Sequence, residues 1–352
     1  MRVLLTGAAG FIGSHVHSGL SAAGHEVVAV DAMLSAAHGP AAAVPHGVRH
    51  VDVRNPDTLD VLLRGIDVVC HQAAVVGAGV SAQDAPGYAS HNDFGTAVVL
   101  AAMDRAGCRK LVLASSMVVY GEGRYYGEQC GAVEVGVRRR ADLDAGIFDH
   151  RCQETGELLT WGSVGEDAPL RPRSLYAASK LAQENYAAAW ATATGACVTA
   201  LRYHNVYGDG MPRDTPYSGV AAIFRSSLEA GQAPQVYEDG RQTRDFVDVT
   251  DVAAANLAAV QQPLPGFVAL NISSGRPITI GEVASALAIA RGGPDPVVTG
   301  RYRAADVRHI VADPDRARRI LGFVAQVDPI EGLTRFASAP LRAAAGVGAP
   351  TV

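Results

Sequence analysis

The sequence is short of cysteine, of positive charge and of long apolar runs, and each shortage excludes a class of protein. Five cysteines in 352 residues are an odd number and too few for a disulfide scaffold, which suits a reducing compartment. No run of about 20 apolar residues could span a bilayer, and a first strand that starts at once leaves no room for a signal peptide. Acidic residues outnumber basic ones, 35 to 30, so the chain lacks a footprint for nucleic acid. We expect a cytoplasmic protein without membrane or nucleic-acid partners.

Glycine is placed where a turn needs it, close to the start of the chain. Gly7, Gly10 and Gly13 follow an apolar run typical of a buried strand and precede a helical pattern. This spacing permits a tight turn, close backbone approach to a pyrophosphate and close helix–strand packing, with the helix N-terminus facing the phosphates. A second apolar run ends in Asp31, whose carboxylate would accept hydrogen bonds from a ribose 2′-hydroxyl and repel a 2′-phosphate. The sequence therefore predicts an NAD site rather than an NADP site.

Strand-like and helical patterns alternate through the first 205 residues. That rhythm predicts an α/β fold with a doubly wound parallel sheet of the Rossmann type. Ligands of such sheets bind at the carboxyl ends of the strands. The predicted strands are 3–6, 27–31, 47–53, 67–71, 110–115 and 196–202, and the main predicted helices are 56–63, 88–105 and 174–193.

The rhythm breaks in two regions, and these define the expected domains. Residues 121–172 contain several glycines, two cysteines and a basic run, and we interpret them as a surface insertion over the mouth of the active site. The basic run, Arg138 to Arg140, is expected to be a solvated charged face. Beyond residue 205 the elements become short and irregular, which favours a smaller C-terminal substrate lobe. The expected organisation is a dinucleotide-binding domain at 1–205, a mainly substrate-binding lobe at 206–343 and a flexible tail at 344–352.

A tyrosine and a lysine carry the predicted chemistry. Tyr176 and Lys180 are four residues apart in a predicted helix, so their side chains share one face. A neighbouring ammonium lowers the pKa of a phenol from about 10 toward neutrality. Tyr176 is therefore predicted to act as a general base on a sugar or alcohol hydroxyl.

Together these motifs resemble the short-chain dehydrogenase/reductase superfamily, in its extended branch of nucleotide-sugar epimerases and dehydratases. The resemblance implies NAD as cofactor, a nucleotide sugar as substrate, and a homodimer formed by a four-helix bundle. The alanine-rich stretches 97–106 and 187–193 suit either such a bundle or the chain's own core. The resemblance covers nearly the whole chain, in the segments 6–13, 71–74, 92–96, 115–121, 176–180, 202–208, 244–248 and 303–306.

The resemblance also implies a role for individual positions. Ser116, Tyr176 and Lys180 would be catalytic, with Ser116 hydrogen-bonded to the reacting hydroxyl. The dinucleotide would be held by Gly7, Gly10, Phe11, Ile12, Gly13, Asp31, Asp52, Val53, Ala73, Ala74, Val76, Asn92, Ser115, Tyr176, Lys180 and Val206. The sugar nucleotide would be held by Ser116, Asn205, Arg244, Arg303 and Asp306. The planar forks of the arginines suit phosphate oxygens, surface ion pairs being the alternative. His71 and His204 are expected to be packed rather than catalytic.

Two apolar residues after Ser116 narrow the reaction. Family dehydratases carry an Asp-Glu pair there, whereas Met117 and Val118 cannot transfer protons. The predicted activity is NAD-dependent inversion at C4 of a nucleotide-linked sugar, dTDP-6-deoxy or UDP, through a transient 4-keto intermediate. The alternatives are an NAD(P)H-dependent keto-sugar reductase, an epimerase acting on a sugar acid or another carbon, and a catalytically silent dinucleotide-binding protein.

The insertion resembles a segment of the dTDP-L-rhamnose 4-epimerase-like proteins, in which two Cys-x-x-Cys pairs resemble a zinc ribbon. In this chain Cys130 and Cys152 are the one remaining cysteine of each pair. Two thiols, even with His150 nearby, fall short of the four ligands of a structural zinc site. No bound metal is therefore expected.

Overall fold

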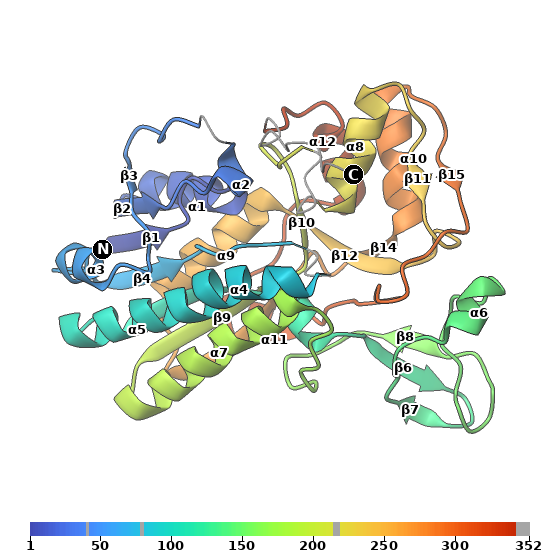
Figure 1. The fold of residues 1–352 in the computed structure, drawn as a ribbon, viewed down its shortest axis with the longest axis horizontal. Coiled ribbons are helices and arrows are strands. Elements are labelled where there is room, and N and C mark those ends of the chain that lie inside the picture. Colours follow the sequence, from blue (N-terminus) through green and yellow to red (C-terminus); the bar gives the residue numbers. More distant parts are fainter. Residues whose placement is uncertain (40–41, 78–80, 214–218, 343–352) are drawn as a thin grey trace.

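A parallel sheet of seven strands forms the centre of the larger lobe in the computed structural model, which describes residues 1–39, 42–77, 81–213 and 219–342 (Figure 1). The strand order is β13-β9-β5-β4-β1-β2-β3, so β1 lies between β2 and β4 and the direction of winding reverses there. A ligand of such a sheet lies at this reversal, beyond the carboxyl ends of the strands. The predicted doubly wound parallel sheet is confirmed. Its strands are β1 (Arg2–Thr6), β2 (Glu26–Asp31), β3 (Val48–His50), β4 (Val68–His71), β5 (Lys110–Ser116), β9 (Cys197–Tyr203) and β13 (Gly266–Ile272).

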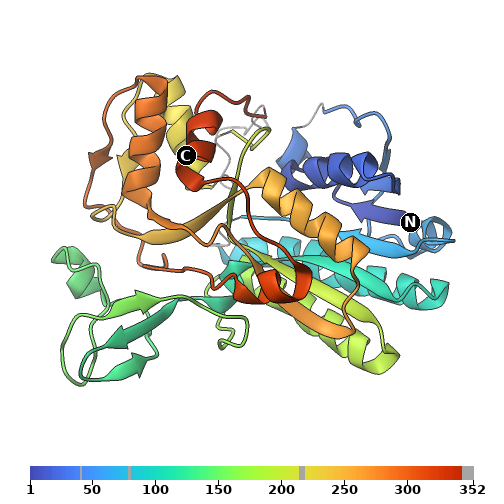
Figure 2. The same cartoon turned by 180° about the vertical axis from the view of Figure 1, so that it is seen from behind.

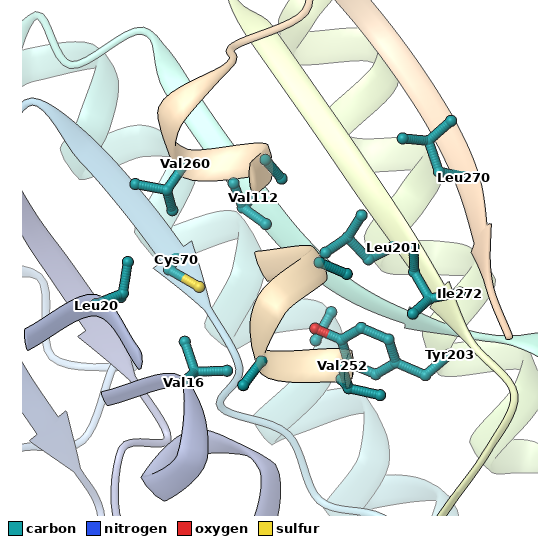
Figure 3. Packing of buried hydrophobic residues seen from close by; sticks show 14 of the residues in the cluster. Val16, Leu20, Cys70, Val112, Leu201, Tyr203, Val252, Val260, Leu270 and Ile272 are labelled. Atoms are coloured by element: carbon teal, nitrogen blue, oxygen red, sulfur yellow. The ribbon is translucent and has the colours of Figure 1, made fainter. Parts of the chain in front are cut away.

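An apolar core covers each face of this sheet, because successive side chains of a strand point to opposite faces. Leu4 packs with α3, α5 and α7, whereas Val3 and Leu5 pack with α1, α9 and α11. Figure 3 shows Val252 and Val260 of α9 among side chains of the sheet and of α1. The helices are α3 (Pro56–Leu62), α5 (Gly95–Ala106) and α7 (Leu175–Thr194) on one face, and α1 (Phe11–Ala22), α9 (Val249–Gln261) and α11 (Asp315–Leu321) on the other; the short α2 (Ser35–His38) follows β2.

The smaller lobe has its own core and lies beyond the carboxyl ends of the large sheet (Figures 1 and 2). The range 206–343, expected mainly to form the substrate lobe, is shared between the two lobes, because β13, α9 and α11 join the large sheet. The smaller lobe contains α8 (Val220–Glu229), α10 (Ile280–Arg291), α12 (Pro329–Phe336), β10 (Asn205–Tyr207), β11 (Gln235–Val236), β12 (Thr243–Asp248), β14 (Pro277–Thr279) and β15 (Val297–Val298).

The helical stretch predicted at 88–105 is built from three pieces. The short helix α4 (Ala85–Tyr88) leads into π-helical turns over Ala89–Phe94, and these lead into α5. Such widened turns are rare in proteins and are found frequently at functional sites. Asn92 lies within them, so the distortion sets the direction of a side chain predicted to line the dinucleotide.

Residues 121–172 form a small antiparallel sheet that projects beside the C-terminal lobe (Figures 1 and 2). Tyr125, Cys152 and Leu159 make its core. Its elements are β6 (Arg124–Gly127), β7 (Gly131–Val133), β8 (Thr160–Gly162), with β6 between the other two, and α6 (Arg140–Asp144).

Buried ion pairs join the insertion to the smaller lobe. Arg138 donates to Glu238 at 2.7 Å, and Arg308 pairs with Asp149 at 2.7 Å and with Glu238 at 2.9 Å. The side chain of Arg138 is 3% exposed, so the expectation of a solvated face is wrong for this residue, while Arg139 is 78% exposed as expected. A buried carboxylate explains the difference, since Glu238 of the other lobe neutralises Arg138.

Replacement of Arg138 by leucine is expected to destabilise the protein by about 1–3 kcal/mol, the cost of leaving a buried hydrogen-bonding group unsatisfied. The same change at the neighbouring Arg139, which is exposed and pairs with the partly exposed Asp142, is expected to stay within about 0.5 kcal/mol. Urea unfolding of both variants measures the difference. Equal stabilities would show that the pair with Glu238 does not hold the insertion in place.

The alanine-rich helices face the chain's own core over part of their surface, since Ala187 and Ala191 are buried in it. Tyr186 of α7 is exposed, and so is Phe94, the residue directly before α5. In the described part of the chain, no helix is long and apolar enough to cross a membrane. The predicted flexible tail at 344–352 lies outside the described residues.

Candidate active site

The glycine-rich turn packs as its spacing predicts. A Cβ atom on Gly13 would lie 1.9 Å from the carbonyl oxygen of Gly7, so α1 approaches the end of β1 too closely for any side chain. Gly7 has φ of +68°, and its Cβ would lie 2.7 Å from the amide nitrogen of Ala73 after β4. Gly10 begins α1 without a side-chain cap. The helix therefore presents backbone N–H groups and its positive end to this edge, which fits the pyrophosphate of a dinucleotide.

Asp31 ends β2 directly beside this turn. Its carboxylate accepts hydrogen bonds from the amide of Ala9 at 3.0 Å and from that of Met33 at 2.8 Å, and His38 lies 3.3 Å away. Burial opposes ionisation, but the bonds from His38, Met33 and Ala9 outweigh it and hold the pKa of Asp31 below its usual range. An ionised acceptor at this point suits a ribose hydroxyl. Arg342, which the sequence analysis missed, donates to the carbonyl of Ala9 at 2.6 Å.

Replacement of Asp31 by alanine is expected to weaken NAD binding by about 10- to 100-fold, because a hydrogen bond to a charged group contributes roughly 1.5–3 kcal/mol. Binding of NADP, which the carboxylate repels, is expected to change less. The control is Glu26→Ala at the exposed start of the same strand. Calorimetric titration of both dinucleotides measures the effect, and an unchanged NAD-to-NADP ratio would contradict this role.

Buried hydrogen bonds fix the segment after β4, which is predicted to line the dinucleotide. The amide group of Asn92 bonds the backbone N–H and C=O of Val75 at 2.8 and 2.9 Å, and donates to Ser179 of α7 at 2.9 Å. The N–H of Ala73 donates to Thr6 at 3.1 Å. The segment after β4 is thereby tied to β1, to the π-helical turns and to α7.

The other predicted dinucleotide residues differ in their burial and in their partners. Asp52 follows β3 and pairs with Arg54 at 2.6 Å, while Val53 is buried in the core. Ser115 donates its hydroxyl to buried Glu184 at 2.5 Å, so this side chain is engaged with the protein. The remaining ones are Phe11 and Ile12 in the first turn of α1, Ala74 and Val76 after β4, and Val206 in β10.

The structure brings Ser116, Tyr176 and Lys180 together at the end of β5. The side chains of Ser116 and Tyr176 are hydrogen-bonded, and the ring of Tyr88 lies 5.9 Å from that of Tyr176. Lys180 is buried and donates to the carbonyl of Ala114 at 3.0 Å. A hydroxyl, a phenol and an amine from β5 and α7 thus face one site.

The expectation that Lys180 brings the pKa of Tyr176 toward neutrality is wrong for this structure. Burial raises the pKa of Tyr176 above its usual value, and the hydrogen bond with Ser116 opposes this rise only in part. Burial also lowers the pKa of Lys180 to about 8, against the attraction of Glu184. Both shifts have the same cause, since a site shielded from water disfavours the charged form of either group.

A buried ion pair beneath the catalytic group was missed in the sequence analysis. Glu184, one helical turn after Lys180, is bonded by Arg202 of β9 at 2.9 and 2.7 Å. Arg202 also donates to the hydroxyl of Tyr120 at 2.9 Å and to the carbonyl of Glu166 at 3.0 Å. A Glu four residues after Lys180 in a helix places both side chains on one face, and this spacing was the available signal.

Four of the predicted sugar-nucleotide residues lie in strands of the smaller lobe or in the segment that follows β15, and Ser116 ends β5 of the large sheet. Asn205 donates to the carbonyl of Asp245 at 3.2 Å and lies 3.7 Å from the sulfur of Met117, next to Ser116. Arg244 donates to the carbonyls of Val307 and Arg308, so its fork holds backbone in this structure.

Two further predicted residues lie near Arg244. Asp306 interacts electrostatically with Arg303 and Arg244. The guanidinium of Arg303 lies 5.3 Å from the ring centre of Tyr237, which is a cation–π contact rather than an ion pair. The positive groups expected for a diphosphate are therefore close together.

His71 and His204 are packed, as expected. His71 lies between the hydroxyls of Thr6 at 2.7 Å and Thr96 at 3.2 Å. Burial lowers the pKa of both histidines to about 3, so both are neutral near pH 7.

The Rossmann sheet, the glycine turn and the Ser–Tyr–Lys group together define an extended short-chain dehydrogenase/reductase. The NAD dependent epimerase/dehydratase family model matches residues 3–139 and 157–273, and the chain belongs to this family. It is 33% identical over 336 residues to dTDP-L-rhamnose 4-epimerase of Burkholderia thailandensis, covering 92% of this chain and 91% of that one. It is 32% identical over 344 residues to UDP-glucose 4-epimerase of Mycolicibacterium smegmatis, covering 95% and 97%.

Solved structures agree with this assignment. The structure of MoeE5 in complex with UDP-glucuronic acid and NAD superposes with a TM-score of 0.76 at 31% identity, covering 96% of this chain and 98% of that one. NAD is the cofactor of this family. The cradle without side chains at Gly7 and Gly13 and the ionised Asp31 fit that dinucleotide.

Proposed function

We propose that this protein is a 4-epimerase of a nucleotide-linked sugar, with a dTDP-6-deoxy sugar or a UDP sugar as substrate. The hydrogen-bonded Ser116–Tyr176 pair, followed by Met117 and Val118 in place of acids, supports this proposal most directly. It supplies a base for one hydroxyl and lacks the carboxylates that elimination of water would use. The likeness to a dTDP-L-rhamnose 4-epimerase supports the choice of carbon and of a deoxy sugar.

Each residue of the site has a separate task in this reaction. The raised pKa that burial gives Tyr176 would fall beside the positive nicotinamide of bound NAD. Tyr176 takes the proton of the 4-hydroxyl and returns it at the end, and Ser116 donates a hydrogen bond to the same oxygen. Lys180 keeps a positive charge beside the site. The glycine turn and Asp31 would hold NAD, whose chemistry there would be reversible hydride transfer at C4. Asn205, Arg244 and Arg303 bind the diphosphate part far from C4, and Asp306 lies near the nucleoside ribose. The keto sugar is therefore retained while its ring turns.

A panel of UDP-, dTDP- and GDP-sugars, followed by NMR at C4, tests this function. We expect the spectra to show a product with inverted configuration at C4, without net consumption of dinucleotide. We also expect NAD to stay bound to the protein through purification. Stoichiometric consumption of NADH with a keto sugar would instead establish the reductase alternative. Bound dinucleotide without turnover of any sugar would establish a silent binding protein.

We also propose that the protein works as a cytoplasmic homodimer. Support comes from exposed Tyr186 on α7 and exposed Phe94 in the π-helical turns directly before α5. The helices α5 and α7 run side by side on one face of the larger lobe (Figure 1). Light scattering after gel filtration measures the mass, and a double Phe94→Asp, Tyr186→Asp variant is expected to be monomeric. An unchanged mass in that variant would place the interface elsewhere.

A further inference from the structure

Two turns of the insertion meet at one end of its small sheet. The first joins β6 to β7 and contains Cys130, and the second runs from Cys152 to Glu157 before β8. The strands β7 and β8 pair antiparallel with β6 on its two sides. The first residues of both strands therefore lie at the Gly127 end of β6, and the turns that precede them meet there. The N–H of Cys152 donates to the carbonyl of Glu157 at 2.9 Å and closes the second turn.

The carboxylate of Glu157 locks the first turn onto the second. It accepts hydrogen bonds from the backbone N–H groups of Gln129 at 3.1 Å and of Cys130 at 3.0 Å, and from the hydroxyl of Thr155 at 3.2 Å. A Cβ on Gly127 would lie 2.4 Å from this carboxylate and 2.5 Å from the sulfur of Cys130. Gly127 therefore leaves the space that the thiol and the carboxylate occupy.

These contacts set the two thiols side by side. The sulfur atoms of Cys130 and Cys152 and an oxygen of Glu157 lie within 4.8 Å of one another, and the two thiols are hydrogen-bonded. Cys152 belongs to the small core of the insertion, and Cys130 packs against that core and is partly exposed. The side of the pair that faces solvent is therefore Cys130, next to the exposed Gln129 and Thr155 of the two turns.

We propose that Cys130 and Cys152 are an oxidisable dithiol that closes to an intramolecular disulfide on exposure to a hydroperoxide. The thiolate sulfur of Cys152 attacks the terminal peroxide oxygen and the O–O bond breaks, which gives a sulfenic acid. The leaving oxygen takes up a proton and departs as an alcohol, or as water when the oxidant is hydrogen peroxide. The sulfur of Cys130 then bonds to that of Cys152, and its proton leaves with the sulfenic hydroxyl as water. In total two thiols are oxidised and one hydroperoxide is reduced.

The hydrogen bonds of the pair assign the two roles. Bonds from Thr155, from Cys130 and from the backbone lower the pKa of the Cys152 thiol to about 7, so a large share is thiolate at neutral pH. The hydrogen bond with Cys152 raises the pKa of Cys130 to about 12, so Cys130 keeps its own proton and remains a thiol beside the Cys152 thiolate. Cys152 is thereby the attacking thiolate and Cys130 the resolving thiol.

The bridge would close a loop that holds the insertion against the smaller lobe. Arg138 and Asp149 both lie between the two cysteines, and they pair with Glu238 and Arg308 of that lobe. Oxidation therefore constrains the segment that carries both contacts. The insertion is expected to become harder to unfold, while the affinity for NAD at the large sheet is expected to stay unchanged.

Peroxide treatment of the reduced full-length protein, followed by alkylation and peptide mass spectrometry, tests the proposal. We expect two of the five thiols to be lost to one Cys130–Cys152 cross-link, while the buried Cys70 and Cys108 and the partly exposed Cys197 stay alkylatable. In Cys130→Ser, dimedone should label Cys152 as a sulfenic acid; in Cys152→Ser, Cys130 should resist both oxidation and labelling. Proteolysis between residues 131 and 151 should slow in the oxidised wild type only.

Several results would overturn the proposal. Both thiols could remain alkylatable after peroxide, or cross-link only between chains on a non-reducing gel. A stoichiometric metal ion in the purified protein that shields both thiols from peroxide would make the cluster of Cys130, Cys152 and Glu157 a metal site instead. These readouts do not use sugar turnover, so they are independent of the proposed function.

Discussion

Replacement of Tyr176 by phenylalanine is expected to lower the turnover of the nucleotide sugar by at least about 10²-fold, the lower end of what a positioned general base contributes. The phenol is the group that takes the proton of the reacting hydroxyl, and its ring remains in the variant to pack against Tyr88. The predicted dinucleotide site is built mainly from the glycine turn and the end of β2, so NAD should remain bound in the variant. Steady-state kinetics and the absorbance of released NAD measure the two properties.

The matched control for this variant is on the same helix. Tyr186 of α7 is 51% exposed and ten residues further along, so Tyr186→Phe removes the same oxygen away from the site. Its turnover should equal that of the wild type. Near-normal turnover of the Tyr176 variant would refute the assigned base, and loss of NAD from it would show a damaged fold instead.

Replacement of Arg202 by methionine is expected to destabilise the protein by about 3–5 kcal/mol, the cost of leaving one charge of a buried pair uncompensated. Arg202 holds Glu184 through two hydrogen bonds, and the side chains of both residues are 3% exposed. Without it, the carboxylate still accepts a hydrogen bond from the hydroxyl of Ser115 but has lost its cation. Chemical denaturation with fluorescence detection measures the change.

A double variant separates the charge from the packing. Glu184→Leu together with Arg202→Met removes both charges and keeps apolar volume, so much of the lost stability should return. The turnover of this double variant is also expected to be lower than its recovered stability would suggest, because Lys180 loses the negative charge of Glu184 one helical turn away. Additive losses of the two single changes would show that the pair is not the cause.

Much of the fold could be predicted because each signal is local. The spacing of Gly7, Gly10 and Gly13 determines a turn, and the apolar run before Asp31 determines a strand and the position of its carboxylate. The alternation of strands and helices then fixes the parallel sheet. The pairing of β13 with β9 joins segments far apart in the chain, and no local pattern indicates it.

The rest of the site depends on distant partners. Arg138 in a basic run looks solvated until Glu238 of the other lobe is known to face it. The pKa of Tyr176 follows from burial by the surrounding chain rather than from the spacing to Lys180. Glu184 differs from other helical acids only because β9 places Arg202 against it. Spacing places Glu184 on the same helix face as Lys180, but it does not indicate any of these partners.

The docking of the insertion has a consequence for protein engineering. Arg308 is 0% exposed and shares its charge between Asp149 of the insertion and Glu238 and Asp239 of the lobe. A shortened chain without residues 121–172 would lose Arg138 and leave the carboxylates of Glu238 and Asp239 facing Arg308 alone, which is an excess of negative charge. A chimaera that receives only this segment would bring Arg138 without its acceptor. Grafting the module successfully requires that Glu238 and Arg308 be transplanted with it.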